Sequence, residues 1–476
     1  MDAEHRIAEL QAQLAAKDAV IERQSVRIAE LTEQVEALTK QVGSLAEVAG
    51  RNSGNSNKPP SSDPPSTREQ RRAKAKLGRK RGAQPGHAGS KRALLPVEQV
   101  DKVVDHFPSQ CESCWTLLPK TPDSSAQRYQ TTELPEVKPH TTEDRLHAVV
   151  CPCCKYKTRA SYEVIAASPF GPRLSSMVAL LTGVYHLSRR SAVSLLQDIV
   201  GVQISLGAVS AVEARVSDAV EAAVEEAWTQ VNQAPVKHTD GTSWFSANLL
   251  CSLWTVATTA ATVFKIVADG KRETLQTFLG NCHGILVSDR ATALRFWAMH
   301  KRQICWAHLL RKFVSFSEGA GPAAAIGKEL LDYVGILFSY WHDFKDGKLS
   351  RDELRALVAP LRMQLEAALA RAAATDIKGV AGSCADILEH KAALWTFIDC
   401  DDVEPTNNHA ERELRRFVLW RKRSFGTQSE RGKLFAERLM TIAHTARKQH
   451  KNVLAFLTAC CTAARNGERV PSLFAV

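Results

Sequence analysis

An alternation of apolar and polar residues between Val236 and Asp289 constrains this chain more than any other feature of its sequence. Four segments, VKHTDGTSWF, NLLCSLWTVATT, ATVFKIVA and GILVSD, are rich in β-branched and aromatic residues, and a polar, helix-like stretch separates the last two. Strands interrupted by a helix predict an α/β sheet. Residues 318–399 are rich in Ala and Leu without a strand pattern, so we expect an all-α segment after the sheet.

Two acids lie at positions where an α/β sheet commonly forms a ligand-binding or catalytic site. Asp240 lies within the first predicted strand, and Asp289 closely follows the apolar run of residues 285–287. Ligands of open α/β sheets bind at the carboxyl ends of the strands. Either acid alone is weak evidence, because the chain has 51 Asp and Glu residues and most acids are solvated.

A third acid belongs to a basic segment, EPTNNHAERELRRFVLWRKRSFG. Pro405 can begin a helix there, which would carry Asn407, Asn408 and Glu411 on one face. The cationic residues of this helix and its end suit the binding of phosphates, and they are Arg412, Arg415, Arg416, Arg421, Lys422 and Arg423. A solvated charge run is the alternative, which the aromatic residues interleaved among these cations disfavour.

The net charge of +11 is unevenly distributed. Residues 1–50 have 5 basic and 9 acidic side chains, whereas residues 51–92 have 12 basic and 2 acidic ones. A basic block of this kind indicates a polyanion partner, and nucleic acid is the first candidate. Gly and Pro prevent a long helix in REQRRAKAKLGRKRGAQPGHAG, so we expect an extended arm whose Arg79, Lys80 and Arg81 contact DNA. A solubilising basic tail is the alternative.

An unbroken heptad over residues 7–45 predicts a parallel, two-stranded coiled coil and therefore a dimer. Its a positions are Ile7, Leu14, Ile21, Ile28, Val35 and Val42, and its d positions are Leu10, Lys17, Gln24, Leu31, Leu38 and Leu45. An amphipathic helix packed on its own chain is the alternative, which the narrow apolar seam disfavours.

Two Cys-x2-Cys pairs, Cys111 with Cys114 and Cys151 with Cys154, predict one tetrahedral Zn²⁺ site in a ribbon-like module. Disulfides are the alternative, which a reducing cytoplasm disfavours. Downstream, helices are expected over residues 174–186, from Ser188 to near Val200 and over 206–216, with a turn at Gly201. Two short helices joined through a Gly turn fit a helix-turn-helix.

These features together resemble the DDE transposases of bacterial insertion sequences of the sixty-six type. The resemblance rests on the three acids, on NNHAERELRRFVLWRKRSFG, CWAHLLRKF, the linker NSNKPPSSD and RKRGAQPGHAG. It implies a ribonuclease H-like catalytic domain with an all-α insertion before the last acid, and Asp240, Asp289 and Glu411 as catalytic carboxylates. It also implies that His308 and Arg311, of CWAHLLRKF, lie near the site, where His308 supports the acids or contacts DNA; an ordinary packed histidine is the alternative.

Three carboxylates in one pocket repel one another unless divalent cations neutralise them, and hard oxygen ligands select Mg²⁺ or Mn²⁺. Two such ions about 4 Å apart can activate a water or a 3′-hydroxyl group and stabilise the leaving oxygen. One site would then serve both cleavage and transfer of a strand. A second zinc set of Cys282, His283, Cys305 and His308 has an unusual spacing and is disfavoured.

The expected function is a transposase that binds the ends of an insertion sequence, acting on DNA as a dimer or higher oligomer, with accessory proteins of the same element as further candidate partners. Two residues depart from the family pattern: Gly241 replaces the usual acid, and Arg290 replaces the usual Gly. They favour the rival hypothesis of a catalytically inert, dimeric, zinc-containing DNA-binding regulator. A metal-dependent nuclease that needs no specific ends is a third class.

The predicted organisation is multidomain, and it is best given as a series of ranges. These are a coiled coil (1–50), a linker and basic arm (51–92), a zinc-binding module (93–165), a helix-turn-helix-like region (166–230), the catalytic domain (231–455, with its insertion at about 318–400) and a C-terminal tail (456–476). We expect a cytoplasmic protein without a membrane span. The longest uncharged stretch, residues 244–264, has seven Ser, Thr or Asn among its 21 residues, and the N-terminus has no apolar signal segment.

Overall fold

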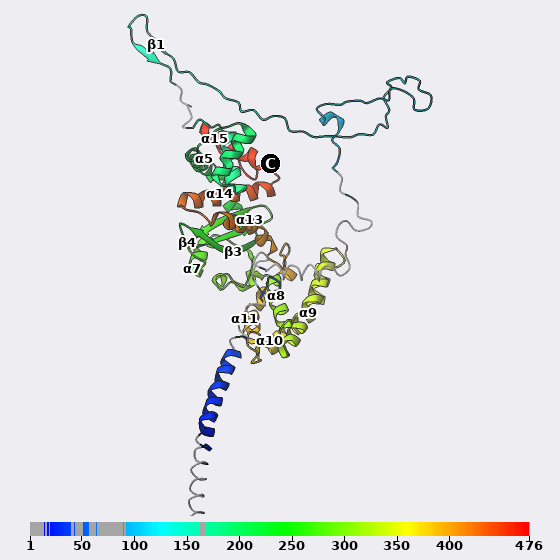
Figure 1. The fold of residues 1–476 in the computed structure, drawn as a ribbon, viewed down its shortest axis with the longest axis vertical. Helices are drawn as coiled ribbons and strands as arrows, with labels where there is room; N and C mark the ends of the chain where they lie inside the picture. The colour runs from blue at the N-terminus through cyan, green and yellow to red at the C-terminus, as the bar shows by residue number, and fades with distance from the viewer. Residues whose placement is uncertain are drawn as a thin grey trace, which may run out of the picture. The chain divides into compact units, whose positions relative to one another are not determined.

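The computed structural model (Figure 1) describes residues 20–39, 51–56, 92–161 and 168–475, and the single positions 14, 17, 18, 42, 63 and 89. The chain divides into two compact units. One consists of Met1–Thr67, Val164–Ser188 and Ser210–Val476, and the other of Arg68–Glu163 and Arg189–Val209. No helix in the described part of the chain has both the length and the apolar composition that a bilayer crossing requires.

A five-stranded mixed sheet lies in the larger unit, with strand order β5-β4-β3-β6-β7. The strands are β3 (Val236–Ser246), β4 (Leu249–Ala257), β5 (Thr262–Val267), β6 (Ile285–Ser288) and β7 (Arg302–Ile304). The first three pair antiparallel, and β6 and β7 run parallel to β3. All four strands expected from the sequence form, and α7 (Arg272–Leu279) joins β5 to β6 as expected. The three-residue β7 was not predicted.

Helices α13 (Asn408–Ser424) and α14 (Glu430–Lys448) pack on the sheet (Figure 1). Although α13 is strongly basic, its Ala410, Leu414 and Phe417 recur at helical spacing and are buried. Phe417 packs edge-on against Trp244 of β3, with 5.4 Å between the ring centroids, and 4.9 Å from Phe264 of β5. Burial of this apolar stripe therefore holds α13 beside β3.

The expected all-α insertion separates the sheet from α13. It contains α9 (Pro322–Lys345), α10 (Arg351–Ala373), α11 (Ala381–Glu389) and α12 (Thr396–Asp399), and it follows α8 (Trp306–Ser317). Gly327 of α9 is required where α9 meets α8, because a Cβ there would come within 2.2 Å of the Ser317 backbone nitrogen.

The end of the insertion is hydrogen-bonded to the sheet. Gln303 of β7 accepts the backbone N–H of Phe397 at 2.8 Å, and both Gln303 and Trp306 donate side-chain N–H groups to the carbonyl of Leu394. These bonds hold the segment that precedes α13 against β7 and the start of α8.

Three further helices are α3 (Pro172–Ala179, extended by a π-helical turn over Leu180–Val184), α6 (Glu221–Gln233) and α15 (Val453–Asn466), of which α6 packs on β5. The expectation of a C-terminal tail over 456–476 is wrong for most of that range. α15 packs against α3 and buries Phe456, Leu457 and Cys460, and the backbone N–H of Leu473 donates to Glu226 of α6.

The helices expected before the sheet also form. The first runs from Pro172 through Val184, and the second comprises α4 (Arg189–Leu195) and a π-helical turn over Leu196–Val200. Gly201 caps this second helix with a left-handed φ of 70°, which glycine adopts without strain. α5 (Leu206–Ala219) follows, and the Ser205 hydroxyl accepts the N–H of Ala208 at its start.

Little regular structure occurs over residues 92–161 (Figure 1). The strands β1 (Ala148–Val150) and β2 (Lys157–Arg159) pair antiparallel around the second cysteine pair. Near the N-terminus residues 20–39 are helical, and the heptad side chains there are exposed, for example Ile28 at 65% and Val35 at 60%.

Candidate active site

Asp240 lies on β3 and Asp289 follows β6, and these two strands are neighbours in the sheet. In the parallel pair of β3 and β6 the last paired residues are His238 and Val287; Asp240 comes two residues later on β3, and Asp289 comes two residues later, directly after β6 ends. Because side chains alternate between faces of a sheet, both acids point to the same face. The sheet thus brings together two of the three predicted carboxylates.

The third acid, Glu411, lies in the first turn of α13, and Asn407 holds that turn against β3. The Asn407 side chain is fully buried, donates to the Thr239 carbonyl at 2.7 Å, and lies 3.3 Å from Nδ1 of His238 through its Oδ1. Its carbonyl accepts the N–H of Glu411. Asn407 therefore fixes Glu411 next to the strand that carries Asp240.

The pKa of Asp240 reflects the proximity of the other two acids. Burial, together with the charges of Asp289 and Glu411, raises the pKa of Asp240 to about 7, although the N–H of Gly241 and the Arg311 guanidinium oppose the shift. The charges of Asp289 and Glu411 disfavour the ionisation of Asp240, and a divalent cation would stabilise such a donor set.

Asp289 is held by the backbone around it. Its Oδ1 accepts the N–H of Ala291 at 3.0 Å, and its carbonyl accepts a bond from the buried Arg302 of β7, also at 3.0 Å. Arg302 bonds Ser288 as well, and burial lowers the pKa of this guanidinium to about 10. The Arg302 guanidinium thus fixes the backbone that carries the Asp289 carboxylate.

The two departures from the family pattern are both accommodated. Arg290 forms an ion pair with Asp386 of α11, so its guanidinium is held by the helical insertion. Gly241 lies opposite Trp254 of β4, and a Cβ at position 241 would come within 2.6 Å of the Trp254 ring. The indole therefore occupies the space that an acid at 241 would need.

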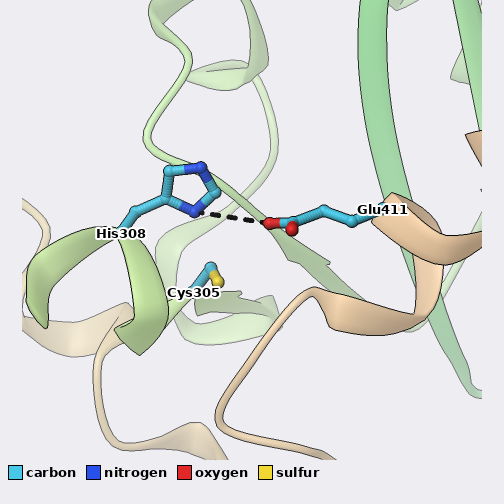
Figure 2. Close-up of side chains that lie close together, drawn as sticks. All are labelled: Cys305, His308 and Glu411. Atoms are coloured by element: carbon cyan, nitrogen blue, oxygen red, sulfur yellow. Dashed lines mark ion pairs between the residues drawn. The ribbon is translucent and has the colours of Figure 1, made fainter. Parts of the chain in front are cut away.

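His308 of α8 faces Glu411 (Figure 2), and Arg311 of the same helix also lies near this carboxylate. Nδ1 of His308 lies 3.9 Å from Oε1 of Glu411, and a terminal nitrogen of Arg311 lies 3.8 Å from Oε2. Burial and the neighbouring Arg311 lower the pKa of His308, and the charges of Asp289 and Glu411 oppose that shift. His308 and Arg311 thus lie on different oxygens of the Glu411 carboxylate.

The expected DNA contacts differ in what the structure leaves available. Asn408, Arg412, Arg415 and Lys422 are exposed. Arg421 instead bonds the hydroxyls of Thr242 and Ser243 on β3. The expectation that Asn407 contacts DNA does not fit its burial and its bonds to β3. Residues 79–81 of the basic arm lie outside the described residues.

The four predicted zinc cysteines form two similar turns. The carbonyl of Cys111 accepts the N–H of Trp115 and that of Cys151 accepts the N–H of Lys155, and in both turns the residue after the second cysteine has a positive φ of about 60°. The pKa of Cys114 is lowered, first by the Thr116 hydroxyl and also by the Cys111 thiol. The two pairs do not converge into one group of possible ligands.

The sequence alone places one residue of this site only in a disfavoured zinc set. Cys305, the residue before α8, lies with His308 and Glu411, and their ligand atoms all lie within 4.8 Å of one another (Figure 2). The disfavoured set combines the Cys-x2-His spacing of Cys305 and His308 with Cys282. That thiol instead lies 3.0 Å from the amide oxygen of Asn232 and is absent from the described group.

Comparison with known families gives two matches. The model described as "Transposase IS66 family" matches residues 167–434, which is more than half of the chain and includes the sheet, the insertion and α13. A model described as a family of unknown function (DUF6444) matches residues 2–93. No curated protein matches the chain.

Proposed function

Because this chain belongs to the IS66 family of transposases, we propose that it binds the ends of an insertion sequence and catalyses metal-dependent cleavage and transfer of DNA strands. The observation that carries the proposal is the convergence of Asp240, Asp289 and Glu411 from β3, β6 and α13, with the pKa of Asp240 raised by burial and by the other two acids.

The strand order supports a ribonuclease H-like catalytic domain. Three antiparallel strands followed by two parallel ones, with β3 in the centre, place the first acid on a central strand and the second at the end of its parallel neighbour. The helical insertion between β7 and α13 is consistent with the same proposal.

Mg²⁺ or Mn²⁺ fits the donor set, since carboxylate oxygens are the ligands that these cations prefer. Asp240, Asp289 and Glu411 would hold the metal, which when bound activates the attacking oxygen and stabilises the leaving one. The chain's own residues fix the carboxylates. Asn407 anchors Glu411 to β3, and Arg302 holds the backbone of Asp289.

DNA contacts are proposed for three parts of the chain. Arg412, Arg415 and Lys422, with Asn408, are exposed polar and basic residues of α13, the helix that carries Glu411. The arm with Arg79, Lys80 and Arg81 would add contacts to phosphates without reading bases. The helices α4 and α5, joined through Gly201, would act as the helix-turn-helix-like module.

The remaining proposals concern assembly. The exposed heptad side chains of the N-terminal helix support dimerisation through a coiled coil, because a single chain leaves that apolar seam in water. The matching turns at Cys111 and Cys151 support one structural Zn²⁺ held by the two cysteine pairs. The zinc-containing regulator remains the alternative, but Trp254 and the Arg290 pair with Asp386 accommodate the departures that favoured it.

A cleavage assay tests the proposal. Full-length protein is incubated with Mg²⁺ or without a divalent cation, on duplexes that contain the ends of the element and on shuffled duplexes of equal length. The proposal predicts cleavage and joining only with the cation and with the ends. Binding without cleavage would favour the regulator, and cleavage of both duplexes alike would favour a nuclease.

A further inference from the structure

Cys305, His308 and Glu411 form a mixed group of sulfur, nitrogen and oxygen donors beside the three acids (Figure 2). Cys305 precedes the first turn of α8 and His308 belongs to that turn, whereas Glu411 comes from α13, about a hundred residues later. The bond from the backbone N–H of Asn407 to the Cys305 sulfur, 3.1 Å long, joins the two helix starts.

Two atoms of the group have unmet hydrogen-bonding capacity. Neither Nδ1 of His308 nor Oε1 of Glu411 has a hydrogen-bond partner among the described residues, although both atoms are buried. A buried polar atom without a partner lowers the stability of the fold, so this arrangement requires a physical reason. A cation between the two atoms would satisfy both.

Glu411 has two oxygens with different neighbours. Oε1 faces His308, whereas Oε2 faces Arg311. The guanidinium opposes a cation in the group, but it lies on the far oxygen, and Asp289 contributes negative charge near His308. Oε1 is therefore the oxygen available to a shared ligand.

The second group of possible ligands in the described chain differs on this point. Asp386, Glu389 and His390 of α11 and its end also lie within ligand distance of one another. However, Arg290 and Arg295 already pair with the carboxylate of Asp386, and Arg295 with that of Glu389. Those carboxylates are neutralised by the protein itself, which leaves the Cys305 group as the one to explain.

We propose that Cys305, His308 and Glu411 form a binding site for a borderline-soft divalent cation, Zn²⁺ in particular, and that zinc bound there inhibits the transposase by withdrawing Glu411 from the other two acids. Thiolate and imidazole ligands select zinc over magnesium, and three protein ligands with an open position are a usual zinc arrangement. Binding releases the thiol proton of Cys305 to solvent. The inhibition rests on the proposed function, whereas the binding of zinc does not.

The binding is tested by counting zinc. Full-length protein and its Cys305→Ser, His308→Gln and Cys384→Ser variants are brought to equilibrium with the same free Zn²⁺, and the bound metal is measured. Cys384 is a matched control, since it is a buried thiol outside both groups. Zinc at the N-terminal cysteine pairs is common to all four proteins and cancels.

The expected result is about one zinc per chain fewer in the Cys305 and His308 variants than in the wild type and the Cys384 variant, as a single-ion site requires. Equal zinc content in all four proteins overturns the site. Melting curves accompany each count. Should one variant be unfolded, the other decides the result, because the two side chains are replaced independently.

The inhibition is tested by titrating zinc into the Mg²⁺-dependent cleavage assay, with each protein normalised to its own rate without zinc. The zinc concentration for half-inhibition should rise at least about tenfold in the Cys305→Ser variant and should not change in the Cys384 variant. Inhibition that is equal in both overturns the shared-ligand inference. A wild type that binds the extra zinc but never cleaves contradicts the proposed function and leaves the site supported.

Discussion

The side-chain amide of Asn407 donates to the backbone carbonyl of Thr239 across 2.7 Å, and this bond joins the helix that carries Glu411 to the strand that carries Asp240. The residues are 168 positions apart in the chain. A backbone acceptor cannot be altered by substitution at position 239, so the geometry of the acids depends on Asn407.

Replacing Asn407 by Ala should lower the cleavage rate by about 100-fold, because displacement of a reacting group by about 1 Å has that effect. It should also lower the free energy of unfolding by roughly 2 to 4 kcal/mol through the lost buried bonds. Cleavage kinetics and melting curves measure the two effects, and Asn281→Ala, in an exposed turn, is the control. An Asn407→Ala protein that folds and cleaves normally would mean that α13 positions Glu411 without this bond.

Removal of any one charge from the three acids should abolish most activity. Asp240→Asn, Asp289→Asn and Glu411→Gln should each reduce cleavage at least about 10³-fold, as expected when charge stabilisation in the transition state is lost. DNA binding and oligomeric state should remain, since these variants keep the basic side chains of α13, the basic arm and the coiled coil. Rates near wild type in all three variants would contradict the assignment of the site.

The control for these variants must be an exposed acid. Glu413, although only two residues from Glu411, is unsuitable: burial alone would raise its pKa, but hydrogen bonds from His409 and His444 and the charge of Lys448 lower it instead. Neutralising Glu413 would therefore disrupt a buried network. Asp352→Asn, whose side chain is 91% exposed, and Glu430→Gln, at 80%, are matched controls.

Acid should destabilise the fold partly through His186, whose ring stacks on Trp420 with 4.6 Å between the centroids. Burial, followed by the charge of Arg416, lowers the pKa of His186 from 6.5 to about 4. The unfolded state therefore binds the proton first, so stability is complete above about pH 6.5 and is lost as the pH falls toward 4.

This contribution is at most about 3 kcal/mol. Urea unfolding at several pH values, on wild type and His186→Asn, measures it. Asn keeps a short polar side chain that tolerates the positive φ of this position and does not titrate. The variant should have a shallower slope between pH 4 and 6.5, and parallel curves would show that His186 does not contribute.

Deleting residues 1–48 should convert a dimer into a monomer or a much weaker oligomer, because the heptad seam is the proposed contact. Light scattering of the truncated protein measures the mass. The melting of the sheet-containing unit should be little changed, which separates lost dimerisation from misfolding. A truncated protein that keeps the mass of the full-length assembly would place the dimer contact elsewhere.

A Cys111→Ser and Cys114→Ser double variant should lose about one zinc per chain if the two cysteine pairs share one structural ion. Metal analysis of the purified protein measures this loss. Cys153→Ser, an exposed thiol within the second turn, is the control for general effects of removing a thiol. Unchanged zinc content in the double variant would refute the shared site.

Local signals were sufficient for much of the fold. The alternation of β-branched residues identified β3 to β6, and the Ala- and Leu-rich periodicity identified the insertion. The strand β7 was not predicted from the sequence because it has three residues, and two of them, Arg302 and Gln303, are polar. Their burial makes sense only once Ser288 and Leu394, both distant in sequence, accept their hydrogen bonds.

The helix α15 was not predicted from the sequence for a related reason. It has apolar residues such as Phe456, Leu457 and Cys460, but whether such a segment packs depends on whether a partner surface exists. That surface is α3, nearly 280 residues earlier in the chain. Sequence periodicity cannot report such a partner, because burial depends on the packing of segments that are distant in the chain.

At the site the sequence by itself determined which residues are acids and where they stand on strand and helix, since these depend on identity and local periodicity. Only the tertiary structure decided that Asn407 is a buried anchor instead of a DNA contact, and that Cys305 lies with His308 and Glu411. The physical reason is the same in both cases. Distances across a core are set by the packing of α13 on β3 and by the approach of Glu411 to α8, whereas spacing along a helix determines which side chains share a face but not what covers that face.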